Sequence, residues 1–451
     1  MKKPKKVLFS FFCFLLVATM LISATQALPQ KTQILNISVI IDYPDHFEQL
    51  VTWLTTVNAQ NFTFVIQEQS KDAILSNQTR INILKAHGEI IPRIADIQTQ
   101  VPDSRINTVV SIISEFNRAL NTTIKGVFDF IPDTYTANYL VTQGITYYQG
   151  YCFDQWKIDY MSMRGGLQMP YYASSQHVNI PSNNTTGIVI LPHASWDWSA
   201  SFTVTHNLQL HPVNVIDRIY NGNTEYAQSY FIQLLDRSMQ ASEPFGYQMI
   251  QFEWDWAYRE GVTDQFATII NAVQTRPYPI LTCSDTVDWF KTAYSQGTPA
   301  YSIDFTSPYN NQRIEWYSNT EFRVARIDQI VVSFVNYTDQ TPDRYLTNYA
   351  SINWAAPSNS SENGIDNSLT FAIDALGGAE DRHSITTDGY PYTGSLADFQ
   401  NIYQPIDPKT DPNQHFLPLL IITVIILILF FVRFRQQIQK KGMLRKIFTL
   451  P

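Results

Sequence analysis

Short apolar runs rich in β-branched residues alternate with stretches of helical periodicity between residue 34 and about residue 295. The run at 34–41 predicts a buried strand, and after it Phe47, Leu50, Val51 and Leu54 recur three and four positions apart, on one face of a helix. The same patterns predict strands at 62–66, 88–91, 124–130, 145–149, 187–191, 247–254 and 279–283, and helices at 71–86, 106–120, 135–143, 224–241 and 262–275. This alternation predicts an α/β domain over residues 28–297, whose parallel sheet is either doubly wound or closed into a barrel. We favour the barrel, because candidate ligand-facing strand ends recur through the whole region rather than at one switch point.

The pattern changes after about residue 300, where helical periodicity ends. Short strands separated by polar turns are predicted at 314–317, 322–327, 330–335, 350–354 and 369–373. Several short strands of this kind favour a β-sandwich over residues 298–397. Residues 398–415 contain Pro405, Pro408 and Pro412, and we expect them to form a short, stiff stalk.

The two ends of the chain predict export and membrane anchoring. Four lysines among the first six residues precede an apolar run and small residues, the order of a secretory signal peptide over 1–27; the alternative is an uncleaved anchor. Residues 416–432 carry no charge and have about the minimum length for a transmembrane helix; a buried soluble helix is the alternative. The tail 433–451 has six basic residues and no acidic one, as expected on the cytoplasmic side. We therefore expect a single-pass protein of the cell membrane, with its large domains outside the cell and its C-terminus in the cytoplasm.

The charge of the exported part follows from these boundaries. Of the 31 basic residues, four lie before residue 28 and six lie after the predicted span, so 21 remain against all 39 acidic residues, a net charge of −18. Nucleic acid and anionic lipid surfaces would repel such a domain, so both are excluded as partners of it. Neutral or cationic ligands are compatible with this charge.

Two further residue types matter in an oxidising compartment. Cys152 and Cys283 either form one disulfide or remain separate buried thiols. Asn-x-Ser/Thr acceptors predict a glycoprotein, although the one at the start of the first strand can be buried; they are Asn36, Asn61, Asn77, Asn121, Asn183, Asn184, Asn336 and Asn359.

Acidic residues gather at the predicted strand ends and are the candidate catalytic groups. The carboxyl ends of barrel strands meet at one mouth, so carboxylates distant in sequence can divide general acid and base work there. Glu253 and Asp255 are two positions apart and are expected on the same face of a strand. The alternative is turn and helix N-cap use. The catalytic candidates are Asp42, Asp45, Glu89, Glu253 and Asp255, with Asp129 and Asp133 at a further strand end.

Aromatic residues provide a candidate sugar-binding groove, because a pyranose offers an apolar face for stacking and hydroxyls for hydrogen bonds. Core packing is the alternative for each ring. The candidate substrate-binding residues are Trp156, Arg164, Tyr171, Tyr172, Trp196 and Trp198.

The histidines, His46 among them, are scattered and show no tight metal-binding spacing. The interval from His193 to His211, with Asp197 and His206, can supply ligands to zinc or a similar ion. The sequence lacks Gly-x-Ser-x-Gly, a Gly-rich phosphate loop and Gly-x-Gly-x-x-Gly. The cofactor is therefore open, and a divalent metal such as zinc is the candidate.

The order of these features resembles the polysaccharide deacetylase family and the wider glycoside hydrolase/deacetylase superfamily over residues 34–295. Residues 40–45 resemble the family's first-strand motif, 84–90 the entry to its second motif, 124–132 its third motif and 144–148 the strand after it. The resemblance implies a distorted barrel of about seven strands and a carbohydrate ligand, with Asp42 as base and Asp45 as metal ligand. Asp42 and Asp45 are not adjacent as in the family, and the histidines of the second motif are replaced, so its metal set is not carried over.

Two functions follow from these observations. The first is a membrane-anchored extracellular hydrolase that cleaves glycosidic, amide or ester bonds of a cell-surface or environmental polysaccharide. The alternative is a non-catalytic surface protein that binds glycan or protein on a degenerate deacetylase-like barrel.

Overall fold

The computed structural model describes residues 31–94, 102–129, 134–150, 169–175, 180–192, 211–337, 365–366 and 390–402. The predicted signal peptide, the transmembrane segment 416–432, the tail 433–451 and most of the stalk lie outside these residues, as do the strands expected at 350–354 and 369–373. Within the described residues, none of the helices combines the length and the apolar character that a membrane crossing requires.

Seven parallel strands form the first domain, as expected for a distorted barrel. β3 (Gly88–Pro92), β2 (Phe62–Ile66), β1 (Gln33–Ile41) and β8 (Gly246–Glu253) pair in that order, and β4 (Gly126–Phe128), β5 (Tyr147–Gly150) and β7 (Val189–Pro192) pair in a second group. A parallel bridge between Arg93 and Phe128, at the ends of β3 and β4, joins the two groups. A short antiparallel strand, β6 (Tyr171–Tyr172), is added beyond β7. The alternation in the sequence therefore predicted this parallel arrangement correctly.

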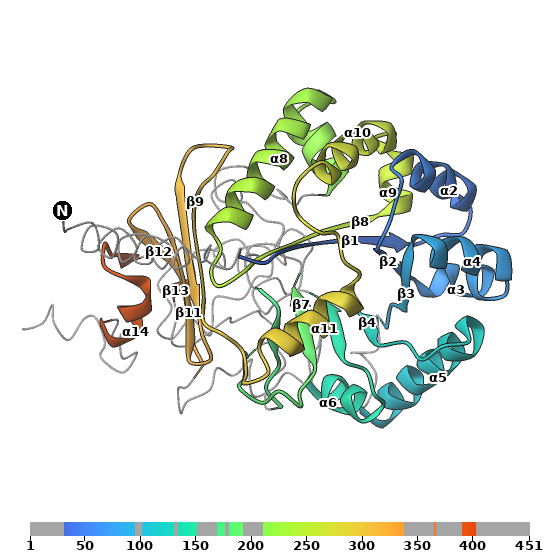
Figure 1. Cartoon of the computed structure of the whole chain (residues 1–451), viewed down its shortest axis with the longest axis horizontal. Helices are drawn as coiled ribbons and strands as arrows, with labels where there is room; N and C mark the ends of the chain where they lie inside the picture. The colour runs from blue at the N-terminus through green and yellow to red at the C-terminus, as the bar shows by residue number, and fades with distance from the viewer. Residues whose placement is uncertain are drawn as a thin grey trace, which may run out of the picture.

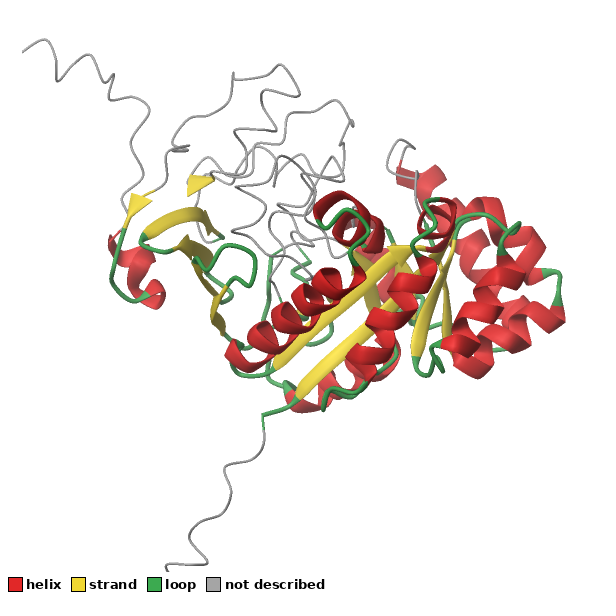
Figure 2. Cartoon of the chain, turned by 90° about the horizontal axis from the view of Figure 1, so that it is seen from above, coloured by secondary structure: helices red, strands yellow, loops and turns green. Residues whose placement is uncertain are grey.

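Helices cover the outside of these strands (Figures 1 and 2). They are α2 (Phe47–Thr56), α3 (Glu68–Leu75), α4 (Gln78–His87), α5 (Pro102–Leu120), α6 (Thr134–Thr142), η2 (Val213–Ile219), α8 (Thr224–Ala241), α9 (Trp254–Arg259), α10 (Thr263–Gln274) and α11 (Cys283–Ala293). The helix expected at 71–86 is two helices, because the Asn77 side chain accepts hydrogen bonds from the backbone N–H groups of Thr79 and Arg80 and so begins α4. The segment η2 is a π-helix, a form that often occurs at functional sites.

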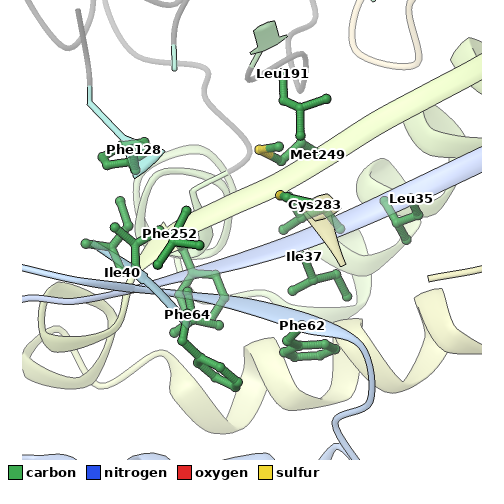
Figure 3. Packing of buried hydrophobic residues seen from close by; sticks show 14 of the residues in the cluster. Leu35, Ile37, Ile40, Phe62, Phe64, Phe128, Leu191, Met249, Phe252 and Cys283 are labelled. Atoms are coloured by element: carbon green, nitrogen blue, oxygen red, sulfur yellow. The ribbon is translucent and has the colours of Figure 1, made fainter. Parts of the chain in front are cut away.

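Apolar residues fill the space around the central strands (Figure 3). Ile37, Phe62, Phe64 and Cys283 are all fully buried. A polar contact also crosses the interior, where Gln149 Nε2 of β5 donates to Ser38 Oγ of β1 at 2.7 Å and to Gln251 Oε1 of β8 at 3.0 Å. These bonds connect strands on opposite sides of the barrel.

The strand expected at 279–283 is absent, and only an isolated bridge joins Ile280 to Leu35. Instead Thr282 accepts a hydrogen bond from the Asp285 N–H and begins α11. This helix lies across the amino ends of the strands, because Cys283 N donates to Thr63 Oγ1 at 3.0 Å and Lys125 pairs with Asp288 at 2.7 Å. Cys283 is a free, buried thiol, and Cys152, the other cysteine of the possible disulfide, lies outside the described residues.

The second domain is one antiparallel sheet, ordered β13-β12-β11-β10-β9, with β14 also paired to β12. Its strands are β9 (Tyr301–Thr306), β10 (Arg313–Ser318), β11 (Phe322–Ile327), β12 (Ile330–Asn336), β13 (Ile365–Asp366) and β14 (Tyr390–Pro391). One face joins the core of the barrel, and α8 lies against β9, where Arg237 Nη1 donates to Thr306 O at 2.9 Å (Figure 1).

The other face of this sheet packs against a short helical segment, η4 (Leu396–Asp398) and α14 (Phe399–Ile402). Phe334 of β12 packs on Phe399 of α14 and also on Phe322 of β11, and all three belong to one buried cluster. The described residues thus contain one sheet with a cover on each face, and they do not contain the second sheet that a β-sandwich requires. The sandwich prediction is therefore supported only as far as an antiparallel β domain.

Candidate functional site

Three polar residues form a row at the carboxyl ends of β1, β2 and β3. Asp42, Gln67 and Arg93 each directly follow a strand, and the last strand residues are register partners. Gln67 Nε2 donates to Asp42 Oδ1, and Arg93 Nη1 donates to Gln67 Oε1. Because a guanidinium only donates, it fixes which end of the Gln67 amide faces Asp42. Hydrogen bonds thus connect the carboxyl of Asp42, through the amide of Gln67, to the guanidinium of Arg93.

Asp42 lies on the barrel-interior side of β1, since Ser38, four residues earlier, contacts Gln149 inside. Burial, and after it the charge of nearby Asp255, raise the pKa of the Asp42 carboxyl from 3.8 to about 7, against the opposing effects of Arg93 and Arg259. Asp42 is therefore present in both its protonated and its ionised form near neutral pH, which is what a general acid or base requires.

Asp255 brings the loop after β1 to the end of β8, 213 residues later in the chain. Its buried carboxylate accepts the backbone N–H of Tyr43 at 2.8 Å and that of Asp42 at 3.2 Å on Oδ2, and His46 Nδ1 lies 2.7 Å from Oδ1. The structure thus brings Asp255 to the loop that begins with Asp42, while the catalytic role predicted for the two residues stays a prediction. The expectation that Glu253 and Asp255 share a strand face is wrong, because β8 ends at Glu253 and Asp255 lies in the first turn of α9.

His46 is held on two sides next to this carboxylate. The Trp254 indole N–H donates to the His46 carbonyl at 3.1 Å, and the ring of Tyr258 lies 4.5 Å from the imidazole. Because the Asp255 carboxylate only accepts, the neutral imidazole carries its hydrogen on Nδ1 and keeps Nε2 as an acceptor. The His46 side chain is 29 % exposed, so Nε2 can meet solvent or a ligand.

A second histidine and carboxylate lie beside the first pair. His211 is buried, and its Nε2 lies 3.8 Å from Glu253 Oε2. The imidazole stacks on Trp256 at 4.0 Å, and the Arg218 guanidinium lies over the Trp256 ring at 5.3 Å. Glu253 is half-buried, so it is the second carboxylate of the region that can meet a ligand.

The other carboxylate candidates lie elsewhere. Asp45 is exposed in the turn that precedes α2. Glu89 lies at the start of β3, the opposite end from Asp42, where it accepts hydrogen bonds from Ser284 N at 3.0 Å and from the Ser284 hydroxyl. Burial raises the pKa of Glu89. The structure therefore does not bring Glu89 together with Asp42 and Asp255. Asp129 is buried after β4, and Asp133 lies outside the described residues.

Of the candidate substrate-binding residues, two are buried in the core and four lie outside the described residues. Tyr171 and Tyr172 are fully buried in β6, and Tyr172 packs against Phe290 of α11. Their assignment to substrate binding is wrong, because rings enclosed in the core have no face left for a sugar. Trp156, Arg164, Trp196 and Trp198 lie outside the described residues.

Metal binding finds no support at this site. Within the described ranges, no three His, Cys, Asp or Glu side chains gather as ligands; His193, Asp197 and His206 lie outside those ranges. The residues around Asp42 do not fit a divalent cation. The Arg93 guanidinium donates to Gln67, which in turn donates to Asp42 Oδ1, so this carboxyl already has a positively charged neighbour. Both oxygens of Asp255 are also engaged, Oδ2 by a backbone N–H and Oδ1 by His46 Nδ1.

Three residues of this site were not singled out from the sequence: His46, Gln67 and Arg93; His211 was considered only as a possible zinc ligand. Gln67 and Arg93 follow strands directly, so the signal that selected Asp42 would have selected them had amides and cations been considered. His46 lies one residue before α2, but its carboxylate partner is more than 200 residues away, and no local pattern marks that contact.

No family model matches the sequence, and no curated protein matches it either. The fold is similar to a solved structure of a probable polysaccharide deacetylase from Pseudomonas aeruginosa PAO1, with 10 % identity and a TM-score of 0.41, covering 59 % of this chain and 93 % of that one. It is also similar to Puue allantoinase, with 10 % identity, a TM-score of 0.40 and coverage of 59 % and 92 %. A CE4 family pseudoenzyme from Bacillus anthracis is 8 % identical, with a TM-score of 0.30 and coverage of 58 % and 67 %. Likeness at this level carries no conclusion about activity, so function is argued below from this chain's own residues.

Proposed function

We propose that this protein is a carbohydrate-active hydrolase in which Asp42 is the general acid and His46 the general base. The observation that carries the proposal is the row Arg93–Gln67–Asp42 at the carboxyl ends of the strands, next to the pair His46–Asp255. The row holds an acid that exchanges its proton near neutral pH, and the pair holds an imidazole whose free nitrogen is an acceptor.

Hydrolysis requires one proton to leave water and one to reach the leaving group. His46 Nε2 takes the proton from the attacking water, and the Asp255 carboxylate stabilises the imidazolium that forms. Asp42 in its protonated form donates to the leaving group. Gln67 already donates to Oδ1, so the transferable proton is on Oδ2. The acid and the base then exchange their proton through solvent before the next cycle.

A carbohydrate substrate is supported by the aromatic side chain next to the acid. Tyr43 is 48 % exposed, and the hydrogen bond from its backbone N–H to Asp255 fixes its position in the chain. An exposed ring beside hydrogen-bonding groups suits the apolar face and the hydroxyls of a sugar. The bond cleaved can be glycosidic, amide or ester, because each needs the same two proton transfers.

We further propose that the enzyme acts outside the cell, anchored by residues 416–432 after removal of residues 1–27. The charge pattern of the two chain ends supports this placement. Protease treatment of intact cells should remove the barrel domain from the membrane fraction and leave the tail 433–451 inside. Protection of the barrel in intact cells would contradict the placement, without bearing on the chemistry.

The test of the chemistry uses the detergent-solubilised full chain with acetylated xylan and glycol chitin. These two polymers offer ester, amide and glycosidic bonds. Acetate release reports cleavage of an ester or amide, and new reducing ends report cleavage of a glycosidic bond. Asp42→Asn should lower kcat/KM at least about 100-fold. Asp264→Asn, which changes an exposed acid of α10, is the matched control and should retain the parent rate.

Parental activity in Asp42→Asn would refute the assignment, and loss of activity in Asp45→Asn instead would move it to the other aspartate of the loop. One observation favours the alternative function: Asp255 Oδ2 accepts two backbone N–H groups, and a carboxylate used in this way can serve structure alone. A non-catalytic glycan-binding protein would retain the polymers without releasing any product, and Asp42→Asn would not change that retention.

A further inference from the structure

The exposed tyrosines that the structure describes in the barrel lie at one end of it. Within the described residues, the barrel tyrosines that are more than a third exposed are Tyr43 at 48 %, Tyr135 at 39 % and Tyr226 at 61 %. Tyr43 follows β1, and Tyr135 lies in the first turn of α6, which follows β4. Both positions are at the carboxyl ends of the strands, where Asp42 lies.

Tyr226 reaches the same end from α8. This helix has 18 residues and ends at Ala241, five residues before β8 begins at the amino end of the barrel. At a rise of 1.5 Å per residue the helix is about 27 Å long, close to the length of an eight-residue strand. The first turn of α8, with Tyr226, therefore lies level with the carboxyl end of β8.

The ring of Tyr226 has a fixed support. It lies 6.4 Å from the ring of Tyr220, which lies 5.9 Å from the ring of Tyr230, a buried residue of α8. The Asn223 side chain accepts the backbone N–H of Tyr226 at 3.1 Å and so fixes the start of the helix. A ring held in this way loses little conformational freedom when a ligand stacks on it.

Contacts run from this support to the candidate site. Tyr220 directly follows the π-helix η2, and Arg218 of η2 lies over Trp256 at 5.3 Å. Trp256 in turn stacks on His211, whose Nε2 lies 3.8 Å from Glu253. The support of the surface tyrosine and the carboxylate of the site are thus linked through η2, which carries Arg218 and is followed by Tyr220.

We propose that Tyr226, supported by Tyr220, is a distal subsite that binds a glycan chain several sugar units away from the bond that is cleaved. Where the cleaved bond lies relative to Tyr226 rests on the proposed function, whereas the binding of glycan at Tyr226 does not depend on it. A flat ring with 61 % exposure offers a stacking face for a pyranose, and its hydroxyl offers a hydrogen bond to the next sugar. Because Tyr226 and Asp42 lie at the same end of the barrel on different elements, a glycan polymer is the ligand that we expect to use both.

The test compares Tyr226→Ala with Tyr309→Ala. Tyr309 is 37 % exposed in the turn between β9 and β10 of the second domain and serves as the matched control. Affinity electrophoresis of the full chain is run in gels that contain glycol chitin, acetylated xylan or hydroxyethyl cellulose. Tyr226→Ala should weaken retention by at least one polymer about tenfold, as expected for one lost stacking contact. Tyr226→Phe and Tyr309→Ala should match the parent.

Kinetics provide the second readout. Tyr226→Ala should raise KM for the polymer about tenfold, leave kcat unchanged and leave a disaccharide substrate unaffected. Equal retention of Tyr226→Ala and Tyr309→Ala, or no retention of the parent by any of the polymers, would overturn the subsite. Retention that depends on Tyr226 without any product would refute the hydrolase and leave the subsite standing. Turnover that does not depend on Tyr226 would support the hydrolase and refute the subsite.

Discussion

Replacing Asp42 by Asn should stabilise the protein above neutral pH even though it removes the proposed acid. Burial and Asp255 disfavour the ionised form of Asp42, which raises its pKa from 3.8 to about 7. Asn keeps an oxygen that can accept from Gln67 but never becomes charged. The variant therefore keeps the row of hydrogen bonds and loses the cost of a buried charge.

The size and the sign follow from proton linkage. Between pH 3.8 and about 7 the folded protein holds a proton on Asp42 that the unfolded chain has lost, so the parent's free energy of unfolding falls as the pH rises. At 1.36 kcal/mol per pKa unit, the loss reaches at most about 4 kcal/mol above pH 7. Part of the carboxyl is hydrated, which makes the observed value smaller than this limit.

Urea unfolding followed by tryptophan fluorescence at pH 4.5, 6.0, 7.5 and 9.0 measures this effect as the difference between Asp42→Asn and the parent. The difference should grow by as much as about 1.4 kcal/mol per pH unit up to pH 7 and then stay constant. Other titrating groups cancel, because both proteins contain them. Asp264→Asn should show a difference that does not change with pH. A difference for Asp42→Asn that is also independent of pH would refute the account of the site's electrostatics.

Three further outcomes are expected. Arg93→Met removes a cation that lowers the pKa of Asp42, so the pKa of this acid should rise. Because Asp42 must be protonated to donate, the alkaline limb of the pH–activity profile should move to higher pH; an unchanged limb would contradict this role. Arg326→Ala breaks a buried pair with Glu315 and two carbonyl contacts and should cost about 3–5 kcal/mol of unfolding free energy. Arg313→Ala, whose exposed guanidinium pairs with Asp304 and also reaches Glu315 at 3.2 Å, should cost less; equal costs in urea unfolding would count against this reasoning. Asn36→Ala removes a buried side-chain amide that donates at 2.7 Å both to a carbonyl and to a hydroxyl near α11 and should cost about 1–3 kcal/mol. Asn61→Gly, at an exposed position whose positive φ glycine adopts without strain, is its control and should cost less.

The burial of Asn36 also bears on modification of the chain. Both Nδ2 hydrogens are used inside the core, so a sugar on this nitrogen is incompatible with the folded barrel. Asn61, Asn77, Asn121 and Asn184 are exposed and can accept a sugar. The sequence motif is the same at all five positions, and only the location within the fold separates them.

The fold was largely predictable because its main signal is local. Strand and helix periods alternate in the sequence, and β1, β2 and β8 lie where the apolar runs are. The boundaries of two predicted elements are wrong, because a helix N-cap residue starts a new helix within the apolar pattern. Asn77 divides one expected helix, and Thr282, with Asp285 three residues on, begins α11 in place of the expected strand. Both caps are visible in the sequence, so these boundaries could have been derived.

The site was only partly predictable, because strand direction and distant contacts decide it. Glu89 was grouped with Asp42 although it begins its strand and Asp42 ends one; in a parallel barrel that difference places them at opposite ends. Gln67 and Arg93 occupy the equivalent positions after their strands, and the search for acids and histidines passed over them. The pKa of Asp42 near 7 depends on burial and on Asp255, and no pattern of neighbouring residues contains either. Strand polarity therefore selects which residues can meet, and the packed structure decides which of them changes its chemistry.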